Sequence, residues 1–88
     1  MNYTKHEVDE KTFQILVEYV VDENDIDTDT NLQDNLDLDS QQRVDFFTAV
    51  ENVFAVDIPD DSMKELITFG DVIDYLWKKL RKVGRLME

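Results

Sequence analysis

Apolar residues recur at helical spacing in three long segments of the sequence, and this periodicity constrains the fold more than any other feature. In the last segment they form one stripe, made of Phe69, Val72, Ile73, Leu76, Trp77 and Leu80. Such spacing places the side chains on one face of an α-helix. No segment shows the alternating pattern of a half-buried strand. The sequence therefore predicts an all-α bundle of three main helices and one short helix.

The first helix is expected over residues 5–21. Thr4 and Glu7 are spaced as in a capping box, in which each side chain binds the backbone N–H of the other residue. Residues 22–25 are polar types that favour caps and turns over helix interiors, so they should end this helix.

The second helix is expected over residues 40–54. Its predicted apolar stripe consists of Val44, Phe47, Val50 and Phe54, widened by Phe46 and Val53. Asp45 and Glu51 fall toward the opposite face, which should be exposed to solvent.

Capping patterns also place the two remaining helices. Ser62-x-x-Glu65 predicts the cap of a short third helix, and Thr68-x-x-Asp71 predicts the cap of the last one. Gly84 should end the last helix, because glycine is favoured just after a helix C-terminus.

A long acidic loop over residues 22–37 connects the first two helices. We expect it to be pinned to the core by three apolar anchors, Ile26, Leu32 and Leu36. Alternating carboxylates at Asp25, Asp27 and Asp29 resemble the opening of an EF-hand calcium loop. However, Thr30 stands where that loop needs glycine, and Leu36 stands where it needs the closing glutamate. The pattern therefore favours solvated acids, and we expect no metal site.

The chain has 88 residues and no cysteine, which limits both fold and chemistry. This length predicts one domain over 1–88, with a core over about 5–82 and a short C-terminal tail over 83–88. The absence of cysteine excludes a disulfide framework, a thiolate metal site and a cysteine nucleophile. His6 alone cannot build a histidine triad or a histidine-rich metal site. We therefore expect a protein that is not an enzyme.

Hydropathy indicates a protein without a membrane span. No apolar run approaches the roughly 20 residues that cross a bilayer. Residues 1–10 are polar and acidic, unlike a secretory signal. The expectation is a cytoplasmic monomer.

The net charge of −12 is unevenly distributed along the chain. Residues 1–74 contain 20 acidic against four basic side chains, whereas residues 75–88 contain five basic side chains and one acidic. Such acidity argues against binding to nucleic-acid phosphates and favours partners with basic surfaces. The alternative interpretation is that the charge serves solubility alone.

Ser40 is placed where the acidic loop becomes the second helix. The first N–H groups of a helix lack intrahelical partners and the helix dipole is positive there, so a phosphate on Ser40 would be stabilised. Asp39 and Ser40 are also preferred N-cap residues, so the dipeptide alone indicates no more than a cap. A hydroxyl without a neighbouring general base cannot act as an enzyme nucleophile, but another enzyme can modify it.

At these residues the sequence resembles the acyl carrier protein family, over about Phe13 to Leu80. The family pattern is Leu-Gly-x-Asp-Ser-Leu, an acidic helix, a phenylalanine, Ile-Pro-Asp-x-x, and Thr-x-Gly-Asp before the last helix. The matching segments here are Leu36-Asp37-Leu38-Asp39-Ser40-Gln41, Phe54, Ile58-Pro59-Asp60-Asp61 and Thr68-Phe69-Gly70-Asp71. Their spacing fits the family without a gap.

The resemblance implies a four-helix bundle with 4′-phosphopantetheine esterified to Ser40, next to Asp39. The chain would carry acyl groups as thioesters in fatty acid, lipid or secondary-metabolite biosynthesis. Its partners would be a phosphopantetheinyl transferase and acyl-loading and acyl-transferring enzymes with basic docking surfaces. The implied partner-recognition residues are Gln41, Arg43, Val44, Asp45 and Glu51. Residues expected to line a space for the acyl chain are Phe47, Val50, Phe54, Ile58, Leu66, Ile73 and Leu76.

Two departures from the family pattern point to a specialised carrier. Gln41 replaces the leucine that follows the serine, and Arg43 adds a positive charge to the helix that partners recognise. Two further interpretations stay open at this stage. One is a carrier of aminoacyl, D-alanyl or polyketide groups, and the other is an unmodified acidic helical adaptor for a basic partner.

Overall fold

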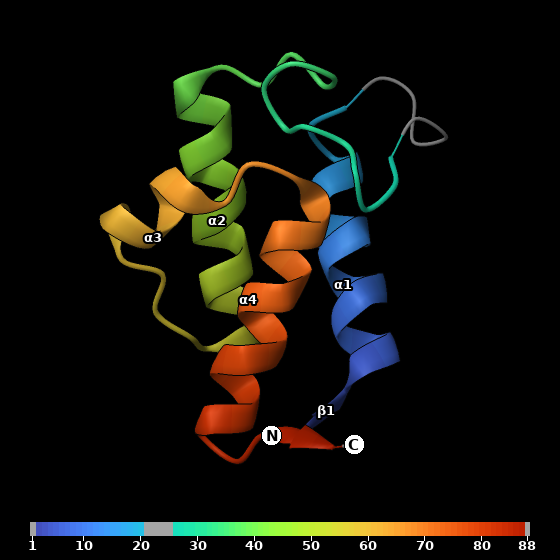
Figure 1. The fold of residues 1–88 in the computed structure, drawn as a ribbon, viewed down its shortest axis with the longest axis vertical. Coiled ribbons are helices and arrows are strands. Elements are labelled where there is room, and N and C mark those ends of the chain that lie inside the picture. The colour runs from blue at the N-terminus through green and yellow to red at the C-terminus, as the bar shows by residue number, and fades with distance from the viewer. Residues whose placement is uncertain (1, 21–25, 88) are drawn as a thin grey trace.

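The computed structural model describes residues 2–20 and 26–87 and consists mainly of helices (Figure 1). The helices are α1 (Lys5–Val17), α2 (Ser40–Phe54), α3 (Asp60–Glu65) and α4 (Phe69–Lys82). The short α3 lies beside α2, while α1 runs opposite in direction to α2 and α4 (Figure 1). The prediction of three main helices and one minor helix is confirmed.

Two short strands join the ends of the described chain, which the sequence did not predict. β1 (Tyr3–Thr4) pairs in parallel with β2 (Leu86–Met87), so that Tyr3 lies opposite Leu86. The buried Tyr3 ring contacts Phe54 edge-on at 5.1 Å, and its hydroxyl donates to the Val53 carbonyl at 3.2 Å. The packed region therefore extends on both sides of the expected 5–82 core, and the tail belongs to the fold as far as it is described.

The core collects side chains from α1, α2, α4 and β1 and from the loops between the helices. Its buried apolar members are Tyr3, Val8, Leu16, Leu32, Leu38, Phe46, Phe47, Val50, Phe54, Ile58, Leu66, Phe69, Val72, Ile73, Leu76 and Leu80. Burial of such side chains contributes about 1.5–3 kcal/mol each relative to exposure. Stability therefore depends on packing, as expected for a chain without cysteine.

The capping boxes expected at α1 and α4 are both present. At α4 the Thr68 hydroxyl accepts from the Asp71 N–H at 3.0 Å, and the Asp71 carboxylate accepts from the Thr68 N–H at 3.0 Å. This backbone donor and that of Ile67 hold the pKa of Asp71 below its usual value of 3.8. A lowered carboxyl pKa means that the cap stabilises the fold at neutral pH and weakens as the pH falls through the acidic range. Gly84 ends α4 with φ of 73°, as predicted.

Three expected details of the helices are wrong. α1 ends at Val17 instead of 21, because the Glu18 and Tyr19 N–H groups bind carbonyls three residues back and tighten the last turn. Residues 21–25, where its end and the stop signal were expected, lie outside the described chain.

The second error concerns the apolar stripe of α2. Val44 and Val53, which were expected in this stripe, stand at its edges and are 47% and 43% exposed.

The third error concerns the start of α3. This helix begins at Asp60, directly after Pro59, and no side chain caps it. The Met63 N–H already binds the Pro59 carbonyl at 3.0 Å, so Ser62 lies inside the helix and not at its cap.

Backbone hydrogen bonds tie the long loop to the start of α4. The Leu32 N–H donates to the Ile67 carbonyl at 3.0 Å, and the Gly70 N–H donates to the Thr28 carbonyl at 2.9 Å. Leu32 is buried, and the other expected anchors, Ile26 and Leu36, pack against the core. The predicted pinning of the loop is thus confirmed, and α4 provides much of the support.

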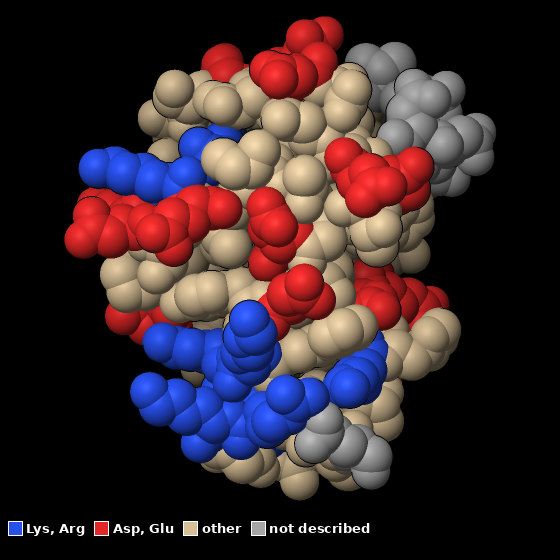
Figure 2. Space-filling view, in the orientation of Figure 1, with Lys and Arg blue, Asp and Glu red and all other residues tan. Residues whose placement is uncertain are grey.

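Acidic side chains cover much of the surface in Figure 2, while Lys and Arg gather at the end of the molecule where α4 ends. Because like charges repel at low ionic strength, we expect added sodium chloride to raise the melting temperature by a few degrees. Magnesium and calcium chloride at millimolar concentration should act alike, which a thermal melt in each salt would measure. Saturable calcium binding with a larger shift than magnesium would contradict this expectation and revive the EF-hand interpretation.

Candidate functional site

Ser40 is the first residue of α2 and its side chain is exposed. The preceding residue, Asp39, is the N-cap, and its carboxylate accepts from the Gln42 N–H at 2.8 Å. The Gln42 side-chain oxygen accepts in turn from the Asp39 N–H at 3.1 Å. The buried Leu38 anchors the chain just before this cap. Ser40 is therefore held at a rigid helix start with its hydroxyl free of the capping bonds.

The Asp39–Gln42 capping box was not predicted above, although the sequence carries a signal for it. Asp39-x-x-Gln42 has the spacing of an acceptor followed by glutamine three residues later. The Gln42 side chain fixes the backbone beside Ser40.

A groove between α2 and α3 opens beside Ser40. It is lined by Ser40, Arg43, Val44 and Phe47 of α2 and by Asp60, Met63 and Lys64 of α3. The lining combines apolar side chains with two cations and one carboxylate. A group attached to the Ser40 oxygen would thus have a partly apolar groove along which to lie.

The electrostatics at Ser40 fit a phosphodiester. The first N–H groups of α2 point outward, and the positive end of its dipole faces the hydroxyl. Arg43 and Lys64 add positive charge in the groove, Asp60 adds a negative charge, and the Asp39 carboxylate accepts from the Gln42 N–H of the cap. The residues present therefore suit a phosphate linkage at this position.

Arg43 connects α2 to α3. One guanidinium nitrogen, Nη2, donates to the Met63 carbonyl at 2.8 Å and to the Leu66 carbonyl at 3.0 Å. The guanidinium carbon lies 5.6 Å from the Phe47 ring centre, which favours a cation–π contact. Arg43 was expected to project toward partners, and its contacts give it a role inside the fold; partner recognition by Arg43 stays a prediction.

The other residues expected to face partners differ in their exposure and in the contacts that they make. Gln41 and Asp45 are exposed and bind one another, with the amide donating to the carboxylate at 2.9 Å. Val44 is exposed beside the groove. Glu51 is half-buried, and its carboxylate accepts from the Ile58 N–H at 3.0 Å, so it supports the connector after α2.

Of the residues expected to line an acyl-chain space, only Phe47 contributes to the groove beside Ser40. The others are buried in the core: Val50, Phe54, Ile58, Leu66, Ile73 and Leu76. An acyl chain could reach these buried side chains only if the packing of the core changed. Their role in sheltering cargo stays a prediction.

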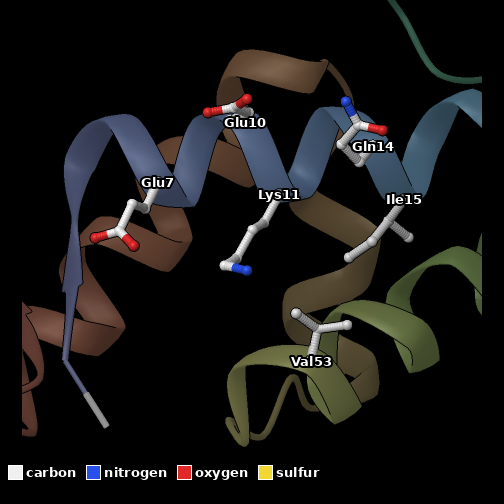
Figure 3. A pocket seen from close by; sticks show the side chains of 6 residues that line it. All are labelled: Glu7, Glu10, Lys11, Gln14, Ile15 and Val53. Atoms are coloured by element: carbon white, nitrogen blue, oxygen red, sulfur yellow. The ribbon is translucent and has the colours of Figure 1, made fainter.

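A second groove lies between α1 and α2, on the side of Val53 (Figure 3). The Lys11 side chain points toward α2, and Ile15 faces Val53 (Figure 3). The remaining lining residues are Glu7, Glu10 and Gln14. This groove offers no serine for attachment, so the candidate site stays at the start of α2.

Within residues 2–20 and 26–87, no cluster of His, Asp or Glu could hold a metal ion. Asp27 uses one carboxylate oxygen to accept from the Asp29 N–H and the Thr30 hydroxyl, which shapes a turn. Asp25, the first acid of the EF-hand pattern, lies outside the described chain. Among the described helices, none is long and apolar enough to span a bilayer.

Comparison with known proteins identifies a family for this chain. Residues 15–76 match the family described as "Phosphopantetheine attachment site". An acyl carrier protein from Thermobifida fusca is 34% identical over 79 residues, covering 89% of this chain and 100% of that protein. One from Lactobacillus johnsonii is 32% identical, over 83% and 92% of the two chains. One from Acidothermus cellulolyticus is 42% identical over 52 residues, where the match spans 59% of this chain and only 62% of that protein.

A helical bundle that matches the attachment-site family defines a phosphopantetheine-bearing carrier. The chain belongs to the acyl carrier protein family. Membership implies a covalently attached 4′-phosphopantetheine group and interactions with a phosphopantetheinyl transferase and acyl-handling enzymes.

Proposed function

We propose that 4′-phosphopantetheine is attached to the Ser40 oxygen and that the chain is a non-catalytic, monomeric carrier in the cytoplasm. Its cargo would be acyl intermediates of fatty acid, lipid or secondary-metabolite biosynthesis. The observation that carries the proposal is the exposed hydroxyl at the start of α2, beside a groove with apolar and cationic lining. When bound, the group supplies the thiol that the protein itself lacks.

The residues around Ser40 have separate tasks in this proposal. The Asp39–Gln42 box keeps the helix start rigid, so the transferase meets the hydroxyl in one orientation. The helix dipole and the neighbouring cations stabilise the phosphate charge. Phe47 and Met63 provide apolar contact for a short acyl group in the groove.

Exposed residues on α2 provide the docking surface in this proposal. Asp45 and Gln41 lie one turn apart next to Ser40, and Val44 stands between them in sequence. Basic side chains on a partner would steer encounters with the acidic surface, with association rates that fall as salt rises. Gln41 replaces the leucine of the common family pattern, and this change would alter which partners dock at the surface.

The attachment site can be tested with the two serines of the chain. After coexpression with a phosphopantetheinyl transferase, the intact mass should increase by one phosphopantetheinyl group. Ser40→Ala should abolish this increase, because the accepting oxygen is removed. Ser62→Ala is the matched control and should keep it, because Ser62 lies within the short helix α3 and is half-buried, whereas Ser40 is exposed and begins α2. Modification that survives in Ser40→Ala and disappears in Ser62→Ala would overturn the assignment.

A further inference from the structure

The end of α4 carries a concentration of positive charge that the carrier function does not use. Lys78, Arg81 and Lys82 are exposed and lie at i, i+3 and i+4, so they share one helix face. Lys79 borders this face and lies 5.9 Å from the Tyr75 ring. Residues 75–87 contain no acidic side chain. Figure 2 shows the resulting concentration of Lys and Arg at one end of the molecule.

Two exposed apolar side chains accompany these cations. Val83 follows α4 directly and is 54% exposed, and Met87 in β2 is 49% exposed. We call Lys78, Lys79, Arg81, Lys82, Val83 and Met87 the basic end. Single exposed apolar residues are ordinary on a protein surface, but here Val83 directly follows Lys82, and Met87 lies in the short strand that follows α4.

Structural roles explain only part of the basic end. Cations in the last turn of α4 interact favourably with the negative end of the helix dipole. Arg85, which follows, is used by the fold, since its guanidinium donates to the Phe54 and Ala55 carbonyls. Neither role accounts for Lys78, which lies before the last turn, or for the exposure of Val83 and Met87.

We propose that the basic end binds the surface of a bilayer that contains anionic lipids. Lysine and arginine side chains would contact the headgroups, while Val83 and Met87 would enter the boundary of the acyl chains. This inference goes beyond the carrier function and does not depend on phosphopantetheine.

The acidic side chains around Ser40 do not prevent this contact at physiological salt. The start of α2, which Ser40 forms, and the end of α4 lie at opposite ends of the bundle (Figure 1). The 15 residues of α2 alone span about 22 Å. This exceeds twice the Debye length of about 8 Å, so charges around Ser40 are largely screened from the bilayer. A bound molecule would also keep Ser40 directed away from the surface and accessible to enzymes.

The composition of the basic end favours a bilayer over an acidic protein. Lysines outnumber arginines, and an ammonium group acts as a point charge without the bidentate geometry that selects carboxylates. An acidic protein would bind the cations but would leave the exposed Val83 and Met87 without a role. A bilayer surface accommodates both kinds of side chain.

The test is sedimentation of the full chain with vesicles. Vesicles of equimolar phosphatidylglycerol and phosphatidylcholine should bind the protein, vesicles of phosphatidylcholine alone should not, and added salt should weaken binding. Lys82→Gln should lower the partition coefficient about fivefold, and Lys78→Gln with Lys82→Gln about 25-fold. Lys11→Gln is the matched control, because it removes the same charge from α1 and should leave binding unchanged.

Other outcomes would overturn the proposal. Absence of binding to the anionic vesicles, or equal losses for Lys82→Gln and Lys11→Gln, would reject the basic end as a lipid surface. Binding to immobilised polyglutamate but not to vesicles would assign it to acidic proteins instead. Salt-sensitive self-association that Lys82→Gln abolishes, without vesicle binding, would assign it to a second copy of the chain. The Ser40→Ala variant should bind vesicles as the parent does, so this result is independent of the attachment test.

Discussion

Arg43→Met is expected to lower the melting temperature by about 10 °C. The guanidinium binds the Met63 and Leu66 carbonyls near the end of α3, and the apolar replacement leaves both without this donor. Hydrogen bonds from charged groups contribute about 1.5–3 kcal/mol each, reduced here because Arg43 is partly exposed, so we expect a loss of about 2 kcal/mol. In a domain of this size that corresponds to roughly 8–16 °C.

Lys64→Met is the matched control for Arg43→Met. Lys64 lines the same groove and is exposed, so its replacement removes the same charge without releasing α3. Its melting temperature should change little. The melting temperature of Arg43→Lys should lie between those of the parent and Arg43→Met, because an ammonium group cannot reproduce the planar donor geometry of the guanidinium. Hydrogen exchange should accelerate at the Leu66 N–H in Arg43→Met only; equal shifts in Arg43→Met and Lys64→Met would show that charge, and not the link to α3, determines the effect.

The contacts of Arg43 change how partner choice should be studied. A substitution there alters both the surface and the attachment of α3, so a change in partner use would have two explanations. Gln41 separates them, because its side chain contacts Asp45 within α2 and does not reach α3. Partner preference is therefore best examined at Gln41.

Local sequence patterns predicted the features that arise within one helix turn. The capping box at α4 joins two residues three positions apart, Thr68 and Asp71. The end of α4 at Gly84 and the start of α2 at Ser40 likewise depend on residues close in sequence. Helical periodicity likewise placed Phe47, Val50 and Phe54 in the core. The start of α2 at Ser40 was predicted because a helix start, unlike a long-range contact, has a local signature, whereas the role of Ser40 as an attachment site was implied by the family resemblance.

The features that sequence did not predict depend on contacts between distant segments. β1 and β2 have two residues each, too few for a strand pattern, and they form because both chain ends meet below the bundle. Arg43 and Glu51 appeared to be surface charges, but their partners are backbone groups 20 and seven residues further on, respectively. The hydrogen bonds between the loop and α4 join main-chain groups, which leave no side-chain pattern in the sequence. The one sequence signal is Gly70, where the Thr28 carbonyl comes close.

Gly70→Ala is expected to destabilise the protein although the residue lies in a helix. Helix propensity alone favours alanine over glycine by up to about 1 kcal/mol. Here, however, an alanine Cβ would stand 2.7 Å from the Thr28 carbonyl oxygen and 3.3 Å from the Thr28 Cβ. Because the closest atom belongs to the backbone, the loop itself must move, and the Gly70–Thr28 and Phe69–Thr30 hydrogen bonds would weaken together.

Forced packing of this kind costs about 1–3 kcal/mol, so the melting temperature should fall by roughly 10 °C. Gly84→Ala is the comparison, since nothing lies within 4 Å of its Cβ position and only its φ of 73° is unfavourable. It should cost about 1–2 kcal/mol from backbone conformation alone, without affecting the loop. Hydrogen exchange distinguishes the two: Gly70→Ala should expose the Leu32 and Phe69 N–H groups, and Gly84→Ala should not. A melting temperature for Gly70→Ala at or above that of the parent would mean that helix propensity exceeds the clash, and that the loop is not fixed by its approach to α4.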